Sequence, residues 1–255
     1  ILVYTELFSQ QSRYWIFFSD KRDVVFNPYE YFDVKAIKRR QKMGISLYDS
    51  ADFPLNEHYI SLIKNVLKDT QITVSRWFNG VAVSATDDVI KSIKQYSFVK
   101  DIIPIERFDM NLCDKYVGVE DNEDYLRELL SKQLEEFSPD AIYKRNLTGK
   151  GIRIAVFDGG FKKIKELSSL KHLFDNNKIV ATYDFTRRRE NVFYGRFHGT
   201  MVVNCIAGVD INDMGGKDLY GLATGAEFLL AKTEVLTEPY SEEENWIAAL
   251  EWADR

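Results

Sequence analysis

The chain has 255 residues, 45% of them hydrophobic and 29% charged, a composition typical of a globular protein that buries a core. The net charge of −5 at pH 7 argues against nucleic acid or an anionic membrane surface as the main partner. No stretch approaches roughly eighteen uncharged apolar residues, so no membrane span is predicted. The two cysteines are too few for a disulfide scaffold or a zinc site.

Both ends of the sequence look cut. Residues 1–12 have two interpretations, the end of a signal peptide cleaved near Ser9 or Gln10, or an N-terminal coil, and Glu6 interrupts the apolar run that a signal would need. Residues 243–254 have helical apolar spacing and no stop signal. We therefore expect the sequence to be a fragment.

Residues 13–105 predict a small α+β unit with the order β-α-β-β-α-β. Its elements are a strand at 14–18, a helix at 57–67, a hairpin of 72–74 with 81–83, a helix at 87–96 and a strand at 98–103. Asn79-Gly80 is the hairpin signal, Thr86 is the expected cap of the second helix, and Pro104 is expected to stop the last strand. Between the first strand and first helix the chain is charged and irregular.

Residues 106–148 predict a polar connector with one amphipathic helix, on which Leu126, Leu129, Leu130 and Leu134 share a face. From residue 149 the pattern changes to apolar strands at 152–157, 179–185 and 226–235. Helices opening at His198 and near Asn245 alternate with them. This alternation predicts an α/β domain with a parallel sheet covered on both faces.

Asp158 directly follows the first of these strands, at the edge where parallel sheets place functional sites. It is either a turn residue that caps the next segment or an acid with a chemical role. A nucleotide site is disfavoured, because Gly149-Lys150-Gly151 precedes the strand and neither Gly-x-Gly-x-x-Gly nor a P-loop follows it.

His198 opens its helix in the sequence His-Gly-Thr, and small residues follow. A helix N-terminus disfavours the charged imidazole, so the position suits a neutral general base, and the alternative is a structural cap. His58 and His172 stand in no motif, and we expect surface or packing roles for both.

Taken together, these motifs resemble those of the subtilisin-like serine proteases, or subtilases. Asp158 in Ile-Ala-Val-Phe-Asp-Gly-Gly precedes His198 in His-Gly-Thr-Met by 40 residues, in the family's order Asp, His, Ser. Residues 221–226 resemble the family's Gly-x-Ala-Pro-x-Ala turn, with Thr224 in place of proline. Met201 after His-Gly-Thr and the helix carrying Trp252 look most like subtilases of Bacteroidetes-type bacteria.

Residues 13–105 resemble the family's inhibitory propeptide through the hairpin at 78–83 and the strand at 99–102. The resemblance therefore implies a ferredoxin-like propeptide at 13–105, a connector at 106–148 and the N-terminal portion of a subtilisin-like catalytic domain at 149–255. That portion would be a truncated three-layer domain with a parallel sheet. It also implies a bacterial zymogen that is secreted or held in the cell envelope.

The implied activity is that of a serine endopeptidase. A serine attacks the peptide carbonyl, His198 takes its proton, and Asp158 orients and stabilises the imidazolium. The family's oxyanion-hole Asn and Gly-Thr-Ser nucleophile motif belong downstream of Arg255, and here Gly199-Thr200 is followed by Met201. We expect the fragment alone to be inactive. Its implied partners are a peptide or protein substrate and its own propeptide as an intramolecular inhibitor.

Two other hypotheses stay open. One is a truncated pseudo-protease whose propeptide-like unit inhibits or chaperones another subtilase. The other makes residues 150–255 an α/β ligand-binding domain in which Asp158 is the acid of a metal or phosphate site.

The resemblance also marks secondary sites. Residues 210–218 are either oxygen ligands for Ca²⁺ or a solvated acidic loop, and no other cofactor is implied. Pro239, Tyr240 and Ser241 fall near the family's substrate-pairing edge strand, and the acids at 242–244 either favour basic substrate side chains or stabilise a helix N-terminus. Cys205 is expected to be a buried packing residue.

Overall fold

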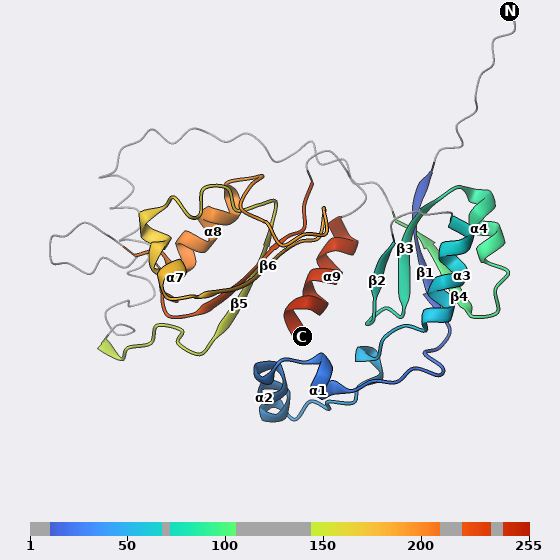
Figure 1. The fold of residues 1–255 in the computed structure, drawn as a ribbon, viewed down its shortest axis with the longest axis horizontal. Helices are drawn as coiled ribbons and strands as arrows, with labels where there is room; N and C mark the ends of the chain where they lie inside the picture. Colours follow the sequence, from blue (N-terminus) through green and yellow to red (C-terminus); the bar gives the residue numbers. More distant parts are fainter. Residues whose placement is uncertain (1–10, 68–71, 106–143, 210–220, 236–241) are drawn as a thin grey trace, which may run out of the picture. The chain divides into compact units, whose positions relative to one another are not determined.

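The computed structural model describes residues 11–67, 72–105, 144–209, 221–235 and 242–255. By their contacts, residues 1–108 and 239–255 form one unit and residues 109–238 form a second (Figure 1). The helical elements of the first unit are α1 (Pro28–Tyr31), α2 (Val34–Met43), the 3-10 turn η1 (Ser50–Asp52), α3 (Glu57–Leu67), α4 (Asp87–Ile93) and α9 (Glu242–Asp254). The expected connector helix lies outside the described residues.

The first unit contains a four-stranded antiparallel sheet. Its strands are β1 (Ser12–Phe18), β2 (Thr73–Ser75), β3 (Gly80–Ala85) and β4 (Val99–Pro104), in the order β2-β3-β1-β4. Alternate strand residues pack with α3 and α4 in one core, which includes Ile16, Val81, Ile63 and Ile93, all fully buried. The elements predicted for 13–105 are thus present, and α3 has the predicted bounds.

The hairpin between β2 and β3 turns at Asn79 and Gly80, as predicted. Asn79 adopts a φ of 48°, a left-handed conformation that asparagine tolerates, and its side-chain amide donates to the main-chain oxygen of Phe18 at 3.1 Å. A Cβ on Gly80 would lie 2.6 Å from the main-chain oxygen of Ile16. Gly80 is therefore required by the close approach of β1 and β3.

Two local predictions are confirmed in position and differ in detail. Thr86 is the N-cap residue of α4 but makes no capping hydrogen bond with its side chain, and the helix begins with Asp87 and Asp88 at its positive end. β4 ends at Pro104, which is itself the last residue of the strand and pairs with Tyr14. Proline is tolerated there because β4 is an edge strand.

The charged stretch between β1 and α3 was expected to be irregular but contains α1, α2 and η1. Asn27 caps α1, Asp33 caps α2 by accepting from the Ala36 N–H at 2.8 Å, and Gly44 ends α2 with a φ of 69°. The apolar periodicity that signals a helix is weak here because α2 buries only Ala36 and Arg40.

Helix α9 groups with the first unit and packs on the sheet face opposite α3 and α4. Ile247 packs with Trp15, Ala82 and Ile105 on that face. The buried Glu251 accepts hydrogen bonds from the hairpin at the end of β2: from the Ser75 hydroxyl at 2.5 Å, the Arg76 N–H at 3.0 Å and the Trp77 N–H at 3.3 Å. The helix therefore has both apolar and charged anchors on the sheet.

The second unit contains a three-stranded parallel sheet of β5 (Arg153–Asp158), β6 (Ile179–Asp184) and β7 (Glu227–Lys232), in the order β5-β7-β6. The short helix α7 (Lys171–Asp175), preceded by the 3-10 turn η2 (Ser168–Leu170), and α8 (His198–Ala207) share one core with the strands. Its buried members include Val156, Leu230, Leu173 and Val203, so both helices cover the same face of the sheet. The parallel sheet is as predicted.

The glycine-rich turn at 221–226 packs against the end of α8. The Gly221 N–H donates to the Gly208 oxygen at 3.0 Å, and the Ala223 N–H donates to the Ile206 oxygen at 2.9 Å. A Cβ on Gly221 would lie 2.4 Å from the main-chain nitrogen of Ala207. The turn thus fixes where α8 ends and β7 begins. Within the described ranges, no helix has the length and apolar character needed to cross a bilayer.

Candidate active site

Asp158 is the last residue of β5, and the sheet register brings charged residues together at this end. In the register it stands opposite Lys232 of β7, which in turn stands opposite Asp184 of β6. The Asp158 side chain is 6% exposed, and its Oδ1 accepts from the N–H of Gly159 at 2.7 Å. Its second oxygen, Oδ2, remains for another partner.

That partner is His198, the first residue of α8. Its Nδ1 lies 2.7 Å from Oδ2 of Asp158. The imidazole is 60% exposed, whereas the carboxylate that holds it is buried. The structure therefore joins the two residues that the sequence singled out into a buried carboxylate that orients an accessible imidazole.

The pair depends on two glycines. A Cβ on Gly199 would lie 2.6 Å from the Gly160 oxygen and 2.9 Å from Cγ of Asp158. Gly160 has a φ of 141°, and a Cβ there would lie 2.1 Å from the Tyr194 oxygen. Larger side chains at these positions would push α8 away from β5, so the small residues beside Asp158 and His198 are a steric requirement of the pair.

The chain that precedes His198 runs alongside the turn after Asp158. Main-chain hydrogen bonds join them: Phe161 N–H to the oxygens of Val192 at 3.0 Å and Tyr194 at 3.2 Å, and Lys162 N–H to the Arg196 oxygen at 3.1 Å. Gly160 and Gly195 form an antiparallel bridge between the two segments. The position of His198 is thus set by its approach loop as well as by its helix.

A buried carboxylate, Asp184, organises this approach loop. It is fully buried, and its Oδ1 accepts from Thr186 N–H at 2.9 Å, the Thr186 hydroxyl at 2.6 Å and Arg187 N–H at 3.1 Å. Its Oδ2 accepts from the Tyr194 hydroxyl. Burial and the bond to this carboxylate raise the pKa of Tyr194. Sequence reasoning missed Asp184, although it is the last residue of β6 just as Asp158 is the last residue of β5.

Lys232 lies between the two aspartates in the sheet register. Burial lowers the pKa of its ammonium, while Asp184 opposes that shift. Its Nζ donates to the main-chain oxygen of Glu234 at 2.5 Å and lies 3.5 Å from the Thr186 hydroxyl. A cation at this place offsets the buried negative charge of Asp184.

The other predicted site residues have different outcomes. Pro239, Tyr240 and Ser241, and the acidic loop at 210–218, lie outside the described residues. Glu244 is fully buried and forms a two-bond ion pair with Arg13, at 2.7 and 2.5 Å, which stabilises the packing of α9 in the first unit. In the part of the chain that the structure describes, His, Cys, Asp and Glu form no group of three that could hold a metal ion.

The remaining candidates have surface or packing positions. His58 is exposed on α3, and His172 is half-buried in α7, where burial lowers its pKa. Cys205 is exposed, which corrects the expectation that it is buried. Its helix turns Val203 and Ala207 toward the core instead, so the cysteine falls on the outer face of α8.

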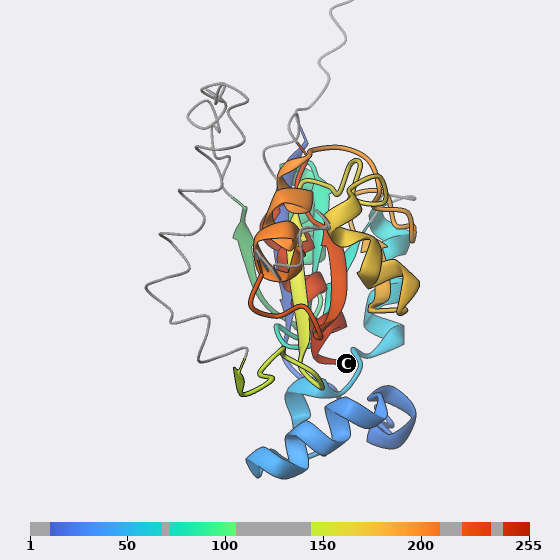
Figure 2. The same cartoon turned by 90° about the vertical axis from the view of Figure 1, so that its left-hand side faces the viewer.

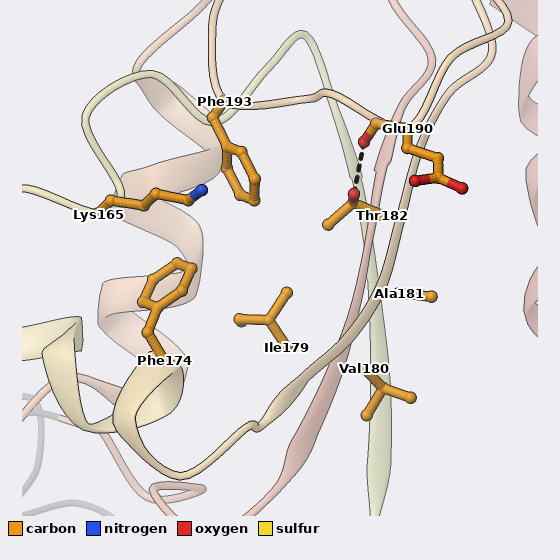
Figure 3. Close-up of a pocket in the computed structure, with 8 residues that line it drawn as sticks. All are labelled: Lys165, Phe174, Ile179, Val180, Ala181, Thr182, Glu190 and Phe193. Atoms are coloured by element: carbon orange, nitrogen blue, oxygen red, sulfur yellow. Dashed lines mark hydrogen bonds between the residues drawn. The ribbon is translucent and has the colours of Figure 1, made fainter.

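A cavity of about 400 Å³ opens beside the edge strand β6 (Figure 3). Phe174, Ile179 and Phe193 supply its apolar wall, and Lys165 lies with its Nζ 3.9 Å from the centre of the Phe193 ring. The Thr182 hydroxyl donates to the Glu190 oxygen on its other side at 2.5 Å. Neither Asp158 nor His198 lines this cavity.

Comparison with known proteins finds a matching family and a sequence relative. Residues 13–123 match the family described as "Peptidase S8 propeptide domain, Bacteroidota". An extracellular serine protease of Serratia marcescens is 32% identical over 99 residues, which are 39% of this chain. Because that match spans 9% of the Serratia protein's length, it concerns a small part of a much longer protein.

Among solved structures, fervidolysin from Fervidobacterium pennivorans has a similar fold. Its structure is described as that of a keratinolytic enzyme related to subtilisin. The superposition has a TM-score of 0.51 at 14% identity and covers 96% of this chain and 34% of fervidolysin. At this identity the likeness concerns the fold, which is the mixed α/β fold of a subtilisin relative.

Proposed function

Because this chain belongs to the subtilisin-like serine proteases and carries their propeptide domain, we propose that Asp158 and His198 are two members of a serine endopeptidase triad. The observation that carries this proposal is the 2.7 Å contact between Nδ1 of His198 and Oδ2 of the buried Asp158. This contact leaves the rest of the imidazole accessible to a serine hydroxyl. General-base activation of a serine needs this access.

In this mechanism the buried carboxylate fixes the imidazole tautomer. With Nδ1–H donating to Asp158, Nε2 is the unprotonated nitrogen that takes the serine proton. The serine then attacks the peptide carbonyl, and Asp158 stabilises the imidazolium that forms. The serine and the oxyanion-hole donor would come from chain beyond residue 255, so the 255-residue chain alone is proposed to be inactive.

Residues 13–105 are proposed to be a ferredoxin-like propeptide that inhibits the protease within the same chain. The strand order β4-β1-β3-β2, with α3 and α4 on one face, supports the ferredoxin-like topology. The hold of the β2–β3 hairpin on Glu251 supports the inhibitory role, because α9 lies within residues 149–255, the proposed catalytic domain. Secretion, or a place in the cell envelope, is proposed from the extracellular Serratia relative. Ca²⁺ binding at 210–218 stays a prediction.

The test is to express the chain together with the coding sequence that follows the Arg255 codon and to measure hydrolysis of a casein substrate. We expect activity after the propeptide is cleaved off in the region 105–130, and we expect it to be lost by at least about 10³-fold in His198→Ala. Met201→Ala, an exposed residue of the same helix, is the matched control and should retain activity.

An extended protein that folds and is cleaved but hydrolyses no substrate would contradict the assignment. If a stop codon directly follows Arg255, the hypothesis of a pseudo-protease takes its place. The 255-residue chain should then slow casein hydrolysis by a mature bacterial subtilase.

A further inference from the structure

The segment between β1 and α3 forms a compact helical arm, which we define as residues 27–52. Its halves are joined by a buried ion pair in which the two guanidinium nitrogens of Arg40 lie 2.8 and 3.3 Å from the carboxylate of Asp52. Asp52 also accepts from the indole N–H of Trp77 at 3.2 Å, which attaches the arm to the β2–β3 hairpin. The arm is thus held in one position relative to the sheet.

Lys21 strengthens this attachment at the base of the arm. The three N–H groups of its ammonium are shared among four main-chain oxygens, those of Ser50, Ala51 and Phe53 at 2.7, 2.8 and 2.7 Å from Nζ, and that of Arg76 at 2.8 Å. Three of these oxygens lie in or directly after η1 and the fourth lies in the hairpin. A single ammonium therefore ties the arm to the hairpin.

The ribbon of the arm, with α1 and α2, lies near the C-terminal end of α9 (Figures 1 and 2). Charged side chains join the arm to the last turn of that helix. Arg39 donates to Oδ1 of Asp254 at 2.5 Å and to its main-chain oxygen at 3.0 Å. Arg40 donates to Oδ2 of the same carboxylate at 2.5 Å. Because the Arg40 side chain is only 7% exposed and already fixed by Asp52, it presents its charge to Asp254 without having to be ordered.

Main-chain groups add to the contact from both sides. The Asp33 N–H, at the start of α2, donates to the main-chain oxygen of Arg255 at 2.8 Å. The Arg255 side chain donates in return to the Tyr31 oxygen at the end of α1, also at 2.8 Å. Oxygens in the last turn of a helix lack partners within the helix and carry its negative dipole end. Arginine side chains and a main-chain N–H are donors that fit these oxygens.

We propose that the arm is a recognition surface whose partner is the acidic last turn of the protease helix α9. This rests on the proposed function, in which α9 belongs to the catalytic domain and residues 13–105 to the propeptide. The arm then gives the propeptide a second, charge-selective hold, separate from the contact of the sheet with Glu251. A protease whose corresponding helix lacks the acid would be held less tightly.

The proposal is tested on the 255-residue chain by hydrogen–deuterium exchange of the α9 amides, read by mass spectrometry. Asp254→Asn keeps the size of the side chain and removes its charge, and Arg39→Gln removes one partner from the arm. Each single variant should speed amide exchange in residues 251–255 about fivefold at low salt. The double variant should exchange no faster than Asp254→Asn alone, because the two side chains act as one pair. Raising NaCl from about 0.05 to 0.5 M should speed exchange in the parent chain and change Asp254→Asn less.

Lys38→Gln is the matched control, since it makes the same change of charge at an exposed residue of α2. It should leave α9 exchange unchanged. The proposal is overturned if Arg39→Gln and Asp254→Asn exchange like the parent chain while their circular dichroism shows an intact fold, or if Lys38→Gln speeds exchange as much as Arg39→Gln. Arg39 is 42% exposed, so its variant is expected to fold.

This measurement is independent of proteolysis. An active extended protease with unchanged exchange in these variants would remove the arm proposal and leave the proposed function standing. Faster exchange in an extended protein that has no protease activity would keep the contact and remove the proposed function.

Discussion

The Tyr194 hydroxyl donates to the fully buried carboxylate of Asp184, and this bond spans the loop that leads to His198. Tyr194 also supplies the oxygen that accepts from Phe161 N–H, next to the Asp158 turn. One tyrosine therefore connects the end of β6 to the segment that holds Asp158 and His198.

Replacing this tyrosine should destabilise the second unit. Tyr194→Phe leaves Oδ2 of Asp184 without its hydroxyl donor, which should lower the free energy of unfolding by ~1–3 kcal/mol. Urea denaturation followed by fluorescence measures the change. Tyr29→Phe, at a tyrosine that is 63% exposed, is the control and should shift the midpoint very little. Equal midpoints for the two variants would contradict the role given to Tyr194.

Gly199→Ala sets helix propensity against packing. Propensity alone predicts a gain of ~1 kcal/mol, because alanine is the better helix former. The new Cβ would meet the Gly160 oxygen and the Asp158 side chain, so we expect a net loss of ~1–3 kcal/mol in denaturant unfolding. The control Met201→Ala, at an exposed position of α8, should change stability by less than ~0.5 kcal/mol. A more stable Gly199→Ala variant would show that α8 can move away from β5.

Lys21→Met should loosen the base of the arm. The substitution keeps an unbranched side chain but leaves four main-chain oxygens without their common donor. Bonds from a charged donor are among the stronger ones, so we expect a loss of ~2 kcal/mol or more in urea denaturation. Lys91→Met, at an exposed lysine paired with an exposed aspartate, is the control. The same small loss in both variants would argue that the four bonds add little.

His172 should make the chain acid-sensitive. Burial lowers its pKa below the ordinary value of 6.5, so the unfolded chain takes up the proton at a higher pH than the folded chain does. Stability contributed by this group is therefore complete above pH 6.5 and falls as the pH drops below that value. Thermal unfolding at pH 7.5 and 5.5 should show a smaller drop in Tm for His172→Gln than for the parent chain. His58→Gln, at an exposed histidine, should retain the parent's drop, and an equal drop in all three proteins would contradict the prediction.

The sequence predicted the elements whose apolar pattern faces a core. Helix α3 lies where its apolar periodicity predicted it, because it buries a regular apolar face. The β2–β3 hairpin lies where Asn79-Gly80 predicted it, because the turn needs these special residues. Asp158 and His198 could be named because each stands at the end or start of such an element. The family resemblance implied that the two residues interact, and the structure adds the geometry of their 2.7 Å contact.

The sequence did not predict what charged residues do when they pack. Arg40 and Asp52 are buried as a pair in a segment whose charged sequence is typical of a solvent-exposed region. Nothing in the sequence around Asp184 distinguishes it from an ordinary acid at the end of a strand. Periodicity treats such residues as exposed, and nothing in the spacing of single residues reveals which partner neutralises them. The prediction that Cys205 is buried was wrong for the opposite reason. Apolar residues occupy both faces of α8, so apolar neighbours in the sequence do not tell which face is buried.

The edges of the antiparallel sheet have a further consequence. At one edge, β2 is only three residues long, and at the other β4 exposes Lys100, Asp101 and Pro104. Within the described residues, the shortness of β2 and the charges and proline of β4 disfavour pairing with a strand from another copy. At high concentration, newly synthesised chains should therefore fold into separate sheets rather than add strands to one another and form fibrils.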